Sequence, residues 1–390
     1  MPGLPRLWLR HETRATECRT PLVPADAARL VGRGVRITVE DSAQRVVPLG
    51  EYVRAGCDTA PAGSWPQAPD DAYVLGLKEL PDEPSALRHR HIYFGHAYKG
   101  QPGARALLGR FTAGGGTLLD LEYLTHDDGR RVAAFGYWAG YVGAALAVLH
   151  RRGTLKAPLP TMDLVELDGL LRGGGAPDAG EAAGDPGAGD PKVGEATGEA
   201  SAGLGAGALV IGALGRSGRG ACDALETAGI APVRWDVAET RNLDRAALLS
   251  HGLVVNTVLV NRPVPPFLTP EALRSPDRRI SVLSDVTCDV GSACNVLPVY
   301  DEVTSWERPV RRLVDGDRPV DLIAIDNLPS LLPAEASRAF SAELWPQLLN
   351  LPGPGGGEGG GPDCPAWSRA KGRFTEAVHA ARLEENPREP

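Results

Sequence analysis

The sequence lacks a long apolar run. Its longest apolar helix candidate, residues 135–150, is rich in glycine and shorter than the roughly 20 residues that a membrane-spanning helix needs. The first residues, 1–6, contain no apolar core of signal-peptide length, and charged residues follow closely between Arg10 and Arg14. These absences argue against a membrane or secreted protein, and we expect a cytoplasmic one.

Excess positive charge is also missing. Lysine and arginine number 41 against 49 aspartates and glutamates, so the net charge is −8, and no basic stripe is present. We therefore expect no nucleic-acid partner. Cysteines are few and scattered, and the close pair Cys288 and Cys294 lacks a second pair or a histidine cluster at zinc-site spacing. We expect reduced thiols and no metal. The six cysteines are Cys18, Cys57, Cys222, Cys288, Cys294 and Cys364.

The sequence does contain a glycine-rich turn after a predicted strand. Residues 208–211 form an apolar run typical of a buried strand, Gly212, Gly215 and Gly218 follow at three-residue intervals, and a helical segment comes next. Such a turn lets the backbone approach a pyrophosphate, and the helix N-terminus offers N–H groups and positive dipole charge. The first interval is one residue wider than in G-x-G-x-x-G, so a merely structural turn is an equally good interpretation of this motif alone.

A second predicted strand favours the cofactor interpretation. Residues 232–236 end in Asp236, which lies 18 residues after Gly218. A carboxylate at about this distance binds ribose hydroxyls and repels a 2′-phosphate, which favours NAD over NADP. Arg234 would attract that phosphate, and only the directions of the two side chains decide between the cofactors.

The remaining pattern alternates strands with helices, which predicts parallel sheets covered on both faces. With 390 residues and 43% hydrophobic residues, we expect two Rossmann-like, doubly wound α/β domains with an active-site cleft between them. Residues 1–135 plus 342–390 form the predicted substrate domain, and 136–341 form the predicted NAD domain. Residues 172–207, rich in Gly, Ala, Asp, Glu and Pro, are predicted to be a flexible insertion. The expected strands are 7–10, 34–40, 71–77, 91–95, 116–121, 208–211, 232–236, 253–259, 280–287 and 321–328, and the expected helices are 24–33, 51–56, 216–225, 333–349 and 365–383.

Four polar residues stand at the carboxyl ends of predicted strands, where ligands bind in such sheets. They are Lys78, His96, Lys99 and Glu122. Singly, each is more typical of a solvated loop charge or a satisfied histidine. Together they predict an acid–base pocket, with an imidazole that exchanges protons near neutral pH.

Motifs from one end of the chain to the other resemble the NAD-dependent, lysine-forming saccharopine dehydrogenases. They are RHET at 10–13, GLKE at 76–79, FGHAYK at 94–99, GRRVAAFG at 129–136, GALGRSG at 212–218 and IDNLPSLLPAEAS at 325–337. Alanine dehydrogenase and the transhydrogenase nucleotide-binding subunit share the broader plan.

The resemblance implies an oxidoreductase acting on a CH–NH donor, which converts saccharopine, NAD and water into L-lysine and 2-oxoglutarate, or the reverse. It implies that Lys78 takes the amine proton and that His96 handles protons as water adds to the imine. The acids implied to tune these groups are Glu17, Glu79 and Glu122. The implied substrate residues are Arg19, Lys78, Lys99, Gln101, Arg131, Phe135 and Thr287. The implied cofactor residues are Arg130, Gly212, Gly215, Arg216, Gly218, Asp236, Thr240, Leu259, Val286, Ile325, Asp326, Asn327 and Leu328.

Some positions depart from the family pattern, and two other functions stay open. Fungal relatives tend to have cysteine at the positions of Ser217 and Thr257, an aromatic residue where Leu259 stands, and histidine where Asn327 stands. One alternative is an alanine or opine-type dehydrogenase, although a substrate with one carboxylate would not need both Lys99 and Arg131. The other is a catalytically silent paralogue that binds NAD and regulates a partner. We expect a monomer that acts on small molecules.

Overall fold

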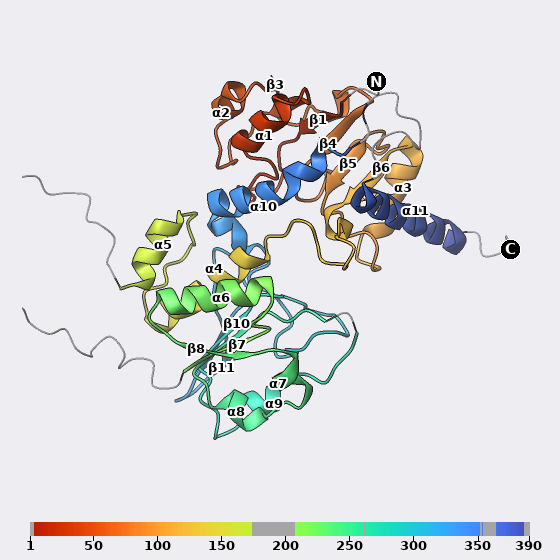
Figure 1. The fold of residues 1–390 in the computed structure, drawn as a ribbon. Helices are drawn as coiled ribbons and strands as arrows, with labels where there is room; N and C mark the ends of the chain where they lie inside the picture. Colours follow the sequence, from red (N-terminus) through yellow and green to blue (C-terminus); the bar gives the residue numbers. More distant parts are fainter. Residues whose placement is uncertain (1–3, 174–206, 261, 352, 354–363, 386–390) are drawn as a thin grey trace, which may run out of the picture. The chain divides into compact units, whose positions relative to one another are not determined.

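The computed structural model describes residues 4–173, 207–260, 262–351, 353 and 364–385. Internal contacts divide the chain into two compact units (Figure 1). Unit 1 comprises residues 1–135 and 333–390, and unit 2 comprises residues 136–332. The domain boundary expected after residue 341 falls inside helix α10 (Pro333–Leu348), which belongs to unit 1 throughout. Of the insertion expected at 172–207, residues 174–206 lie outside the described residues.

Unit 1 is built on a six-stranded sheet in the order β3-β2-β1-β4-β5-β6, and every pair of neighbours is parallel. This order is that of a doubly wound sheet whose direction of winding reverses between β1 and β4. Ligands of such folds bind beyond the carboxyl ends of the strands at that point. The strands are β1 (Arg6–Leu9), β2 (Arg36–Glu40), β3 (Asp58–Ala60), β4 (Ala72–Leu75), β5 (Arg90–Tyr93) and β6 (Thr117–Asp120).

Helices cover both faces of this sheet. One face buries Leu7, Leu9 and Ile37 together with Phe340 of α10, and the other buries Val74, Tyr93 and Phe111. Figure 1 shows α10 beside α1, and α11 beside β6 and α3, which agrees with their contacts. The helices of unit 1 are α1 (Pro24–Val31), α2 (Leu49–Arg54), α3 (Ala104–Gly114), α10 and α11 (Pro365–Glu385), with 3-10 turns η1 (Trp65–Gln67) and η2 (Leu121–Tyr123).

Unit 2 carries a second six-stranded sheet in the order β11-β12-β10-β9-β7-β8. Its neighbours are parallel except for β11, which pairs antiparallel with β12 at the edge. The winding reverses between β7 and β9, and both of these strands are buried along their whole length. The strands are β7 (Ala208–Ile211), β8 (Pro232–Trp235), β9 (Leu253–Asn256), β10 (Val282–Asp285), β11 (Arg311–Val314) and β12 (Val320–Ile323). The expected doubly wound α/β class is confirmed for both units.

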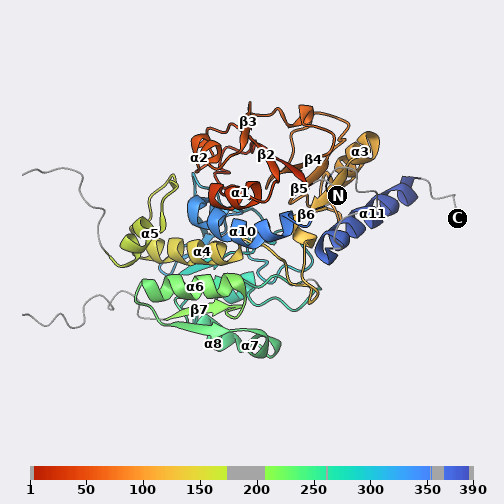
Figure 2. The same cartoon turned by 45° about the horizontal axis from the view of Figure 1, so that its top comes forward.

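Two helices of unit 2 approach each other unusually closely. Helices α4 (Gly136–Arg151) and α6 (Arg216–Thr227) lie side by side (Figure 2). A Cβ atom on Gly140 would lie 1.7 Å from the carbonyl oxygen of Ser217, and one on Gly220 would lie 2.0 Å from that of Tyr137. The contact is therefore possible only because these positions lack side chains. The other helices of unit 2 are α5 (Leu164–Leu171), α7 (Val237–Arg241), α8 (Arg245–Leu249), α9 (Pro270–Leu273) and the 3-10 turn η3 (Leu328–Leu331).

Candidate active site

Lys78 lies three residues beyond the end of β4, and its main chain is bonded on both sides. The N–H groups of Leu77 and Lys78 donate to the carboxylate of Glu12 at 2.6 and 3.0 Å. The carbonyl oxygen of Lys78 accepts a hydrogen bond from the guanidinium of Arg10. Arg10 and Glu12 form an ion pair at 3.2 Å, and their side chains are only 1% and 6% exposed. The predicted base is thus attached to a buried pair of opposite charges.

His96 and Glu122 follow the neighbouring strands β5 and β6 and come together at the same sheet edge. Glu122 Oε2 lies 3.8 Å from His96 Nδ1, and its Oε1 lies 2.8 Å from Lys99 Nζ. Burial raises the pKa of Glu122, but the hydrogen bond and charge of Lys99, with the charges of Arg131 and His96, outweigh it and lower that pKa overall. Burial lowers the pKa of Lys99, but the bond to Glu122 reverses the effect and raises it. Glu122 is therefore held as an anion and Lys99 as a cation.

Asp120, the last residue of β6, fixes the backbone of this group. Its carboxylate accepts hydrogen bonds from the N–H groups of Gly95 at 3.2 Å and Glu122 at 2.9 Å. Burial, which outweighs these bonds and a bond from the His96 backbone, raises the pKa of Asp120 to about 6. His96 itself has a φ of 49°, a conformation that non-glycine residues rarely adopt. A buried acid therefore sets the spacing between His96 and Glu122.

Arg19 is buried in a pair with Glu17. Two hydrogen bonds join them, Nε to Oε1 at 2.7 Å and Nη2 to Oε2 at 2.6 Å. The guanidinium also lies 4.1 Å from the ring centre of Phe135, and that ring stacks on Phe340 at 4.2 Å. An arginine fixed in this way presents a planar, oriented donor group, which suits recognition of a carboxylate.

The other predicted residues of unit 1 are spread over its loops. Glu79 is exposed and pairs with Arg14 at 2.9 Å, and the Gln101 side chain accepts from the N–H of Lys99 at 2.8 Å. Arg130 is 80% exposed on its side chain and pairs with Asp128 in its own turn at 2.5 Å. Arg131 is exposed and near enough to Glu122 to lower the pKa of that acid. The structure therefore brings His96, Lys99, Glu122 and Arg131 together, and groups Glu17 with Arg19 and Phe135.

In unit 2 the glycine-rich turn joins β7 to α6 as the sequence predicts. Gly212 has a φ of 84°, and a Cβ on Gly218 would lie 2.0 Å from the carbonyl oxygen of Gly212. The first residue of α6 follows Gly215, which gives the helix no side-chain cap. The helix N-terminus therefore presents main-chain amides and positive dipole charge without a competing side chain. These features fit the pyrophosphate of a dinucleotide.

Asp236, at the end of β8, faces the glycine-rich turn. Its carboxylate accepts from the N–H groups of Leu214 at 3.0 Å and Val237 at 2.8 Å, which leaves further lone pairs for hydroxyl groups. Thr240 donates its hydroxyl to the carbonyl oxygen of Asp236 at 2.8 Å. Arg234 pairs instead with Glu226 of α6 at 2.6 Å. The basic residue that would attract a 2′-phosphate is thus engaged by another acid.

The remaining cofactor candidates follow β9, β10 and β12. Asp285 organises two of these loops, since it accepts from Asn256 Nδ2 at 3.0 Å and from the Thr287 hydroxyl at 2.7 Å. Val286 and Leu328 pack against the core beside α4. Leu259, after β9, is 62% exposed. After β12, Ile325 is buried and Asp326 is exposed. Asn327 donates to the Ser330 hydroxyl at 3.0 Å. Thr287 belongs to unit 2, whereas the other predicted substrate residues belong to unit 1.

Sequence reasoning missed the buried acids Glu12, Asp120 and Asp285, each of which holds loop amides at a strand end. The available signal was their position, directly at or just beyond the last residue of a strand. The described residues contain no group of three or more His, Cys, Asp or Glu that could hold a metal ion. In those residues, too, no helix is long and apolar enough to cross a bilayer.

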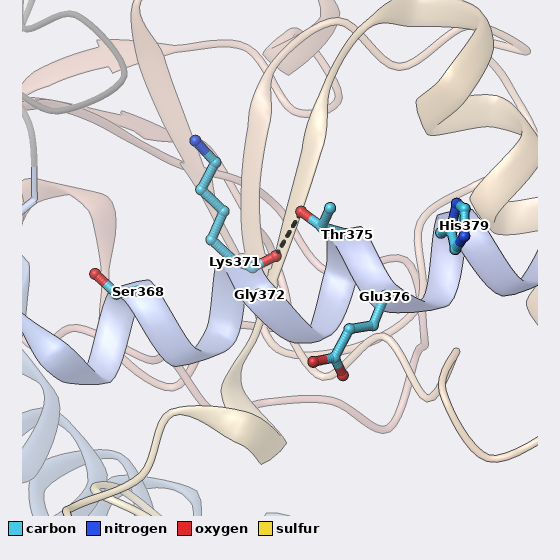
Figure 3. Close-up of a pocket in the computed structure, with 6 residues that line it drawn as sticks. All are labelled: Ser368, Lys371, Gly372, Thr375, Glu376 and His379. Carbon is cyan, nitrogen blue, oxygen red and sulfur yellow. Dashed lines mark hydrogen bonds between the residues drawn. The ribbon is translucent and has the colours of Figure 1, made fainter.

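A surface hollow of unit 1 lies along α11 (Figure 3). Figure 3 shows Lys371 and Glu376 pointing to opposite sides of the helix, and Thr375 donating to the carbonyl oxygen of Lys371. The side chains do not converge on one point, and none belongs to the predicted site. The lining residues are Ser368, Lys371, Gly372, Thr375, Glu376 and His379.

Comparison with known proteins first defines a class. Residues 8–142 match the family described as alanine dehydrogenase/PNT, N-terminal domain. The fold resembles that of an L-alanine dehydrogenase, with a TM-score of 0.62 at 15% identity over 97% of this chain and 99% of the other. It also resembles a transhydrogenase from Sinorhizobium meliloti, with a TM-score of 0.58 at 16% identity over 88% and 93% of the two chains. The fold is therefore that of the alanine dehydrogenase and transhydrogenase class.

Sequence relatives narrow the class further. The saccharopine dehydrogenase [NAD(+), L-lysine-forming] of Schizosaccharomyces pombe is 39% identical over 96% of this chain and 98% of its own length. The protein of the same name from Emericella nidulans is 40% identical over 90% and 92% of the two chains. The chain belongs to the NAD-dependent, L-lysine-forming saccharopine dehydrogenase family.

Proposed function

We propose that this chain oxidises saccharopine with NAD and water to L-lysine and 2-oxoglutarate, or catalyses the reverse reaction. The observation that carries the proposal is that Lys78, His96 and Glu122 follow three adjacent parallel strands in a chain that matches relatives of this name almost from end to end. The overall reaction converts one saccharopine, one NAD⁺ and one water into lysine, 2-oxoglutarate, NADH and a proton.

In this proposal Lys78 removes the proton of the secondary amine, because hydride leaves readily only when the neighbouring nitrogen is neutral. NAD, when bound, supplies the acceptor for that hydride. His96 then takes a proton from the water that adds to the resulting imine. The same residue returns a proton to the departing lysine nitrogen. Glu122 supports both steps through its negative charge near the His96 ring and by keeping Lys99 charged.

The substrate sets an electrostatic requirement, since saccharopine carries three carboxylates. We propose that Arg19, Lys99 and Arg131 bind them, with Gln101 and Phe135 lining the rest of the site. Thr287 is proposed as a further substrate residue. Bidentate pairing suits a planar guanidinium, and the fixed orientation of Arg19 supports that role. A substrate with a single carboxylate, such as alanine, would leave this positive charge uncompensated.

For the cofactor, we propose that the α6 N-terminus binds the pyrophosphate, assisted by Arg216. Arg130 is proposed as a further cofactor residue. Asp236 binds the ribose hydroxyls of the adenosine half, and Asp326 lies toward the nicotinamide. The pairing of Arg234 with Glu226 supports NAD rather than NADP as the preferred dinucleotide. The other proposed contacts come from Thr240, Leu259, Val286, Ile325, Asn327 and Leu328.

The test is NADH formation with saccharopine, alanine or an N-substituted amino acid as substrate. Lys78→Met and His96→Gln should each lower kcat by about 10²- to 10⁴-fold while NAD affinity is retained. The exposed residues Lys156 and His379 supply matched controls, Lys156→Met and His379→Gln, which should leave turnover unchanged. Faster turnover of alanine than of saccharopine would favour the alanine dehydrogenase alternative. Unchanged turnover in both test variants would refute the catalytic assignment, and absence of turnover with bound NAD would favour a silent regulatory protein.

A further inference from the structure

We propose that the buried Arg10–Glu12 ion pair is a positioning device for Lys78, which places the amine by holding the main chain of that residue on both sides. The inference rests on the proposed function, because it requires Lys78 to be the base. Neither Arg10 nor Glu12 reaches the substrate in this account, so both are positioning residues.

The hydrogen bonds surround the peptide groups from which the Lys78 side chain starts. Glu12 accepts from the N–H groups of Leu77 and Lys78 at 2.6 and 3.0 Å, and Arg10 donates to the carbonyl oxygen of Lys78. The two partners are themselves joined at 3.2 Å. The donors and acceptors thus form a closed ring that includes both peptide groups of Lys78.

A long side chain magnifies errors at its base. A lysine amine stands at the end of a flexible four-carbon stem, so a small rotation of its main chain moves the nitrogen considerably. A misplacement of about 1 Å at a reacting group can cost about 10²-fold in rate. Fixing the main chain of Lys78 is therefore an effective way to fix the amine.

The position of the pair in the fold agrees with this role. Arg10 and Glu12 follow β1 and Lys78 follows β4, the two adjacent strands between which the winding of the sheet reverses. The N–H of Arg10 itself donates to the carbonyl oxygen of Leu75 at 3.0 Å. The pair therefore ties the two strand ends together at the place where ligands of this fold class bind.

A buried ion pair is an inefficient way to stabilise a loop, because both charges must be removed from water. Replacing a buried ion pair by apolar groups is often neutral or stabilising, whereas removing one partner is strongly destabilising. The sequence also leaves space for the guanidinium, since a Cβ on Gly76 would lie 2.3 Å from Arg10 Nε. This buried charge pair leaves no room for a side chain at position 76. It is better explained by the precise placement of Lys78 than by a gain in the stability of the protein.

The first experiment measures steady-state kinetics of Glu12→Gln and Arg10→Lys. A glutamine can accept one of the two N–H groups but directs its own NH₂ toward the other, so we expect kcat to fall by about tenfold or more with little change in KM or in NAD affinity. Asp26→Asn is the matched control, since Asp26 is also buried in unit 1 and ion-paired, with Arg29 at 2.7 Å. It should keep the kcat of the wild type. A folded Glu12→Gln protein with wild-type kcat would overturn the inference.

The second experiment separates positioning from general structural damage. If the pair acts through Lys78 alone, adding Glu12→Gln to Lys78→Met should not reduce the residual turnover further. A further loss comparable to the effect of Glu12→Gln in the wild-type background would contradict positioning. Should Lys78→Met itself be fully active, the proposed base is wrong, and that failure is visible before the double variant is made.

A third variant keeps the test available if Glu12→Gln does not fold. Gly76→Ala leaves both charges in place but pushes on the Arg10 guanidinium, and we expect the same loss of kcat. Gly109→Ala is its control, because a Cβ there meets nothing within 4 Å. Equal kcat in the two alanine variants, with both proteins folded, would count against the inference.

Discussion

Glu17 binds Arg19 through two parallel hydrogen bonds of 2.7 and 2.6 Å inside unit 1. Glu17 is fully buried and Arg19 is 4% exposed, so little solvent weakens the pair. Glu17 presents to Arg19 the same chemical group that a substrate carboxylate would present. If Arg19 is a substrate residue, the substrate must share the guanidinium with Glu17 or compete for it.

Arg19→Lys should therefore raise the KM for saccharopine by about tenfold or more, because an ammonium group cannot bind two carboxylates in bidentate geometry. NAD affinity should not change, since Arg19 is not among the proposed cofactor residues. Steady-state kinetics and an NAD titration measure the two effects. Arg29→Lys, in a pair whose arginine is 56% exposed, is the control. An unchanged KM in Arg19→Lys would assign Arg19 a structural role only.

Asp236→Ser should shift cofactor preference toward NADP. Removing the carboxylate removes the group that repels a 2′-phosphate, and we expect the ratio of kcat/KM for NAD to that for NADP to fall by about tenfold or more. Adding Glu226→Gln should lower the ratio further, because Arg234 loses the partner that holds it at 2.6 Å. Glu226→Gln alone serves as the control. An unaltered ratio in Asp236→Ser would remove Asp236 from the cofactor site.

Asp120→Asn should destabilise the protein less at high pH than at low pH. Burial raises the pKa of Asp120 from 3.8 to about 6, so the protonated carboxyl contributes stability that is complete below about pH 3.8 and is lost as the pH rises through 6. The ionised carboxylate then costs the wild type up to about 3 kcal/mol, a cost that asparagine does not incur. Urea unfolding at pH 5 and pH 8 measures the difference, with the exposed Asp82→Asn as control. A pH-independent effect of Asp120→Asn would contradict the raised pKa.

His91→Phe should flatten the dependence of stability on pH below neutrality. Burial, together with the charges of Arg10, His89 and Arg110, lowers the pKa of His91 well below 6.5. The unfolded chain therefore binds a proton that the folded protein excludes, and stability falls as the pH drops below about 6.5, by up to about 1.4 kcal/mol per pH unit. Phenylalanine suits the site because the ring already lies against Trp65 and Phe111. Unfolding free energies at pH 7, 6 and 5 test this, with the exposed His379→Gln as control. Equal slopes for wild type and His91→Phe would contradict the prediction.

The sequence was most informative where a local pattern determines structure. The apolar run before Gly212 and the strands that precede Lys78, His96 and Glu122 form as expected, because their burial on both faces leaves an apolar signature. The edge strands β3 and β11 were missed because short, polar, partly exposed strands lack that signature. The contacts place the unit boundary at the start of α10 rather than after residue 341, and nothing in the sequence of a continuous helix marks which unit its side chains pack against.

Side-chain partners were harder to predict than strand positions. Nothing in the sequence marks Glu12 or Asp120 as special, since their function depends on amides 65 and 25 residues away in the chain. The engagement of Arg234 by Glu226 likewise depends on α6 packing beside β8. Partners of this kind are set by the tertiary fold and leave no local pattern in the sequence.

The glycine contact between α4 and α6 limits how the cofactor preference of this protein can be redesigned. At Gly140 and Gly220 the two backbones touch, and even one methyl group would wedge the helices apart. The amide end of α6 would move with them, and with it the proposed anchor for the phosphates. A mutant library aimed at new dinucleotides should therefore vary the rim around Asp236 and leave both of these glycines untouched.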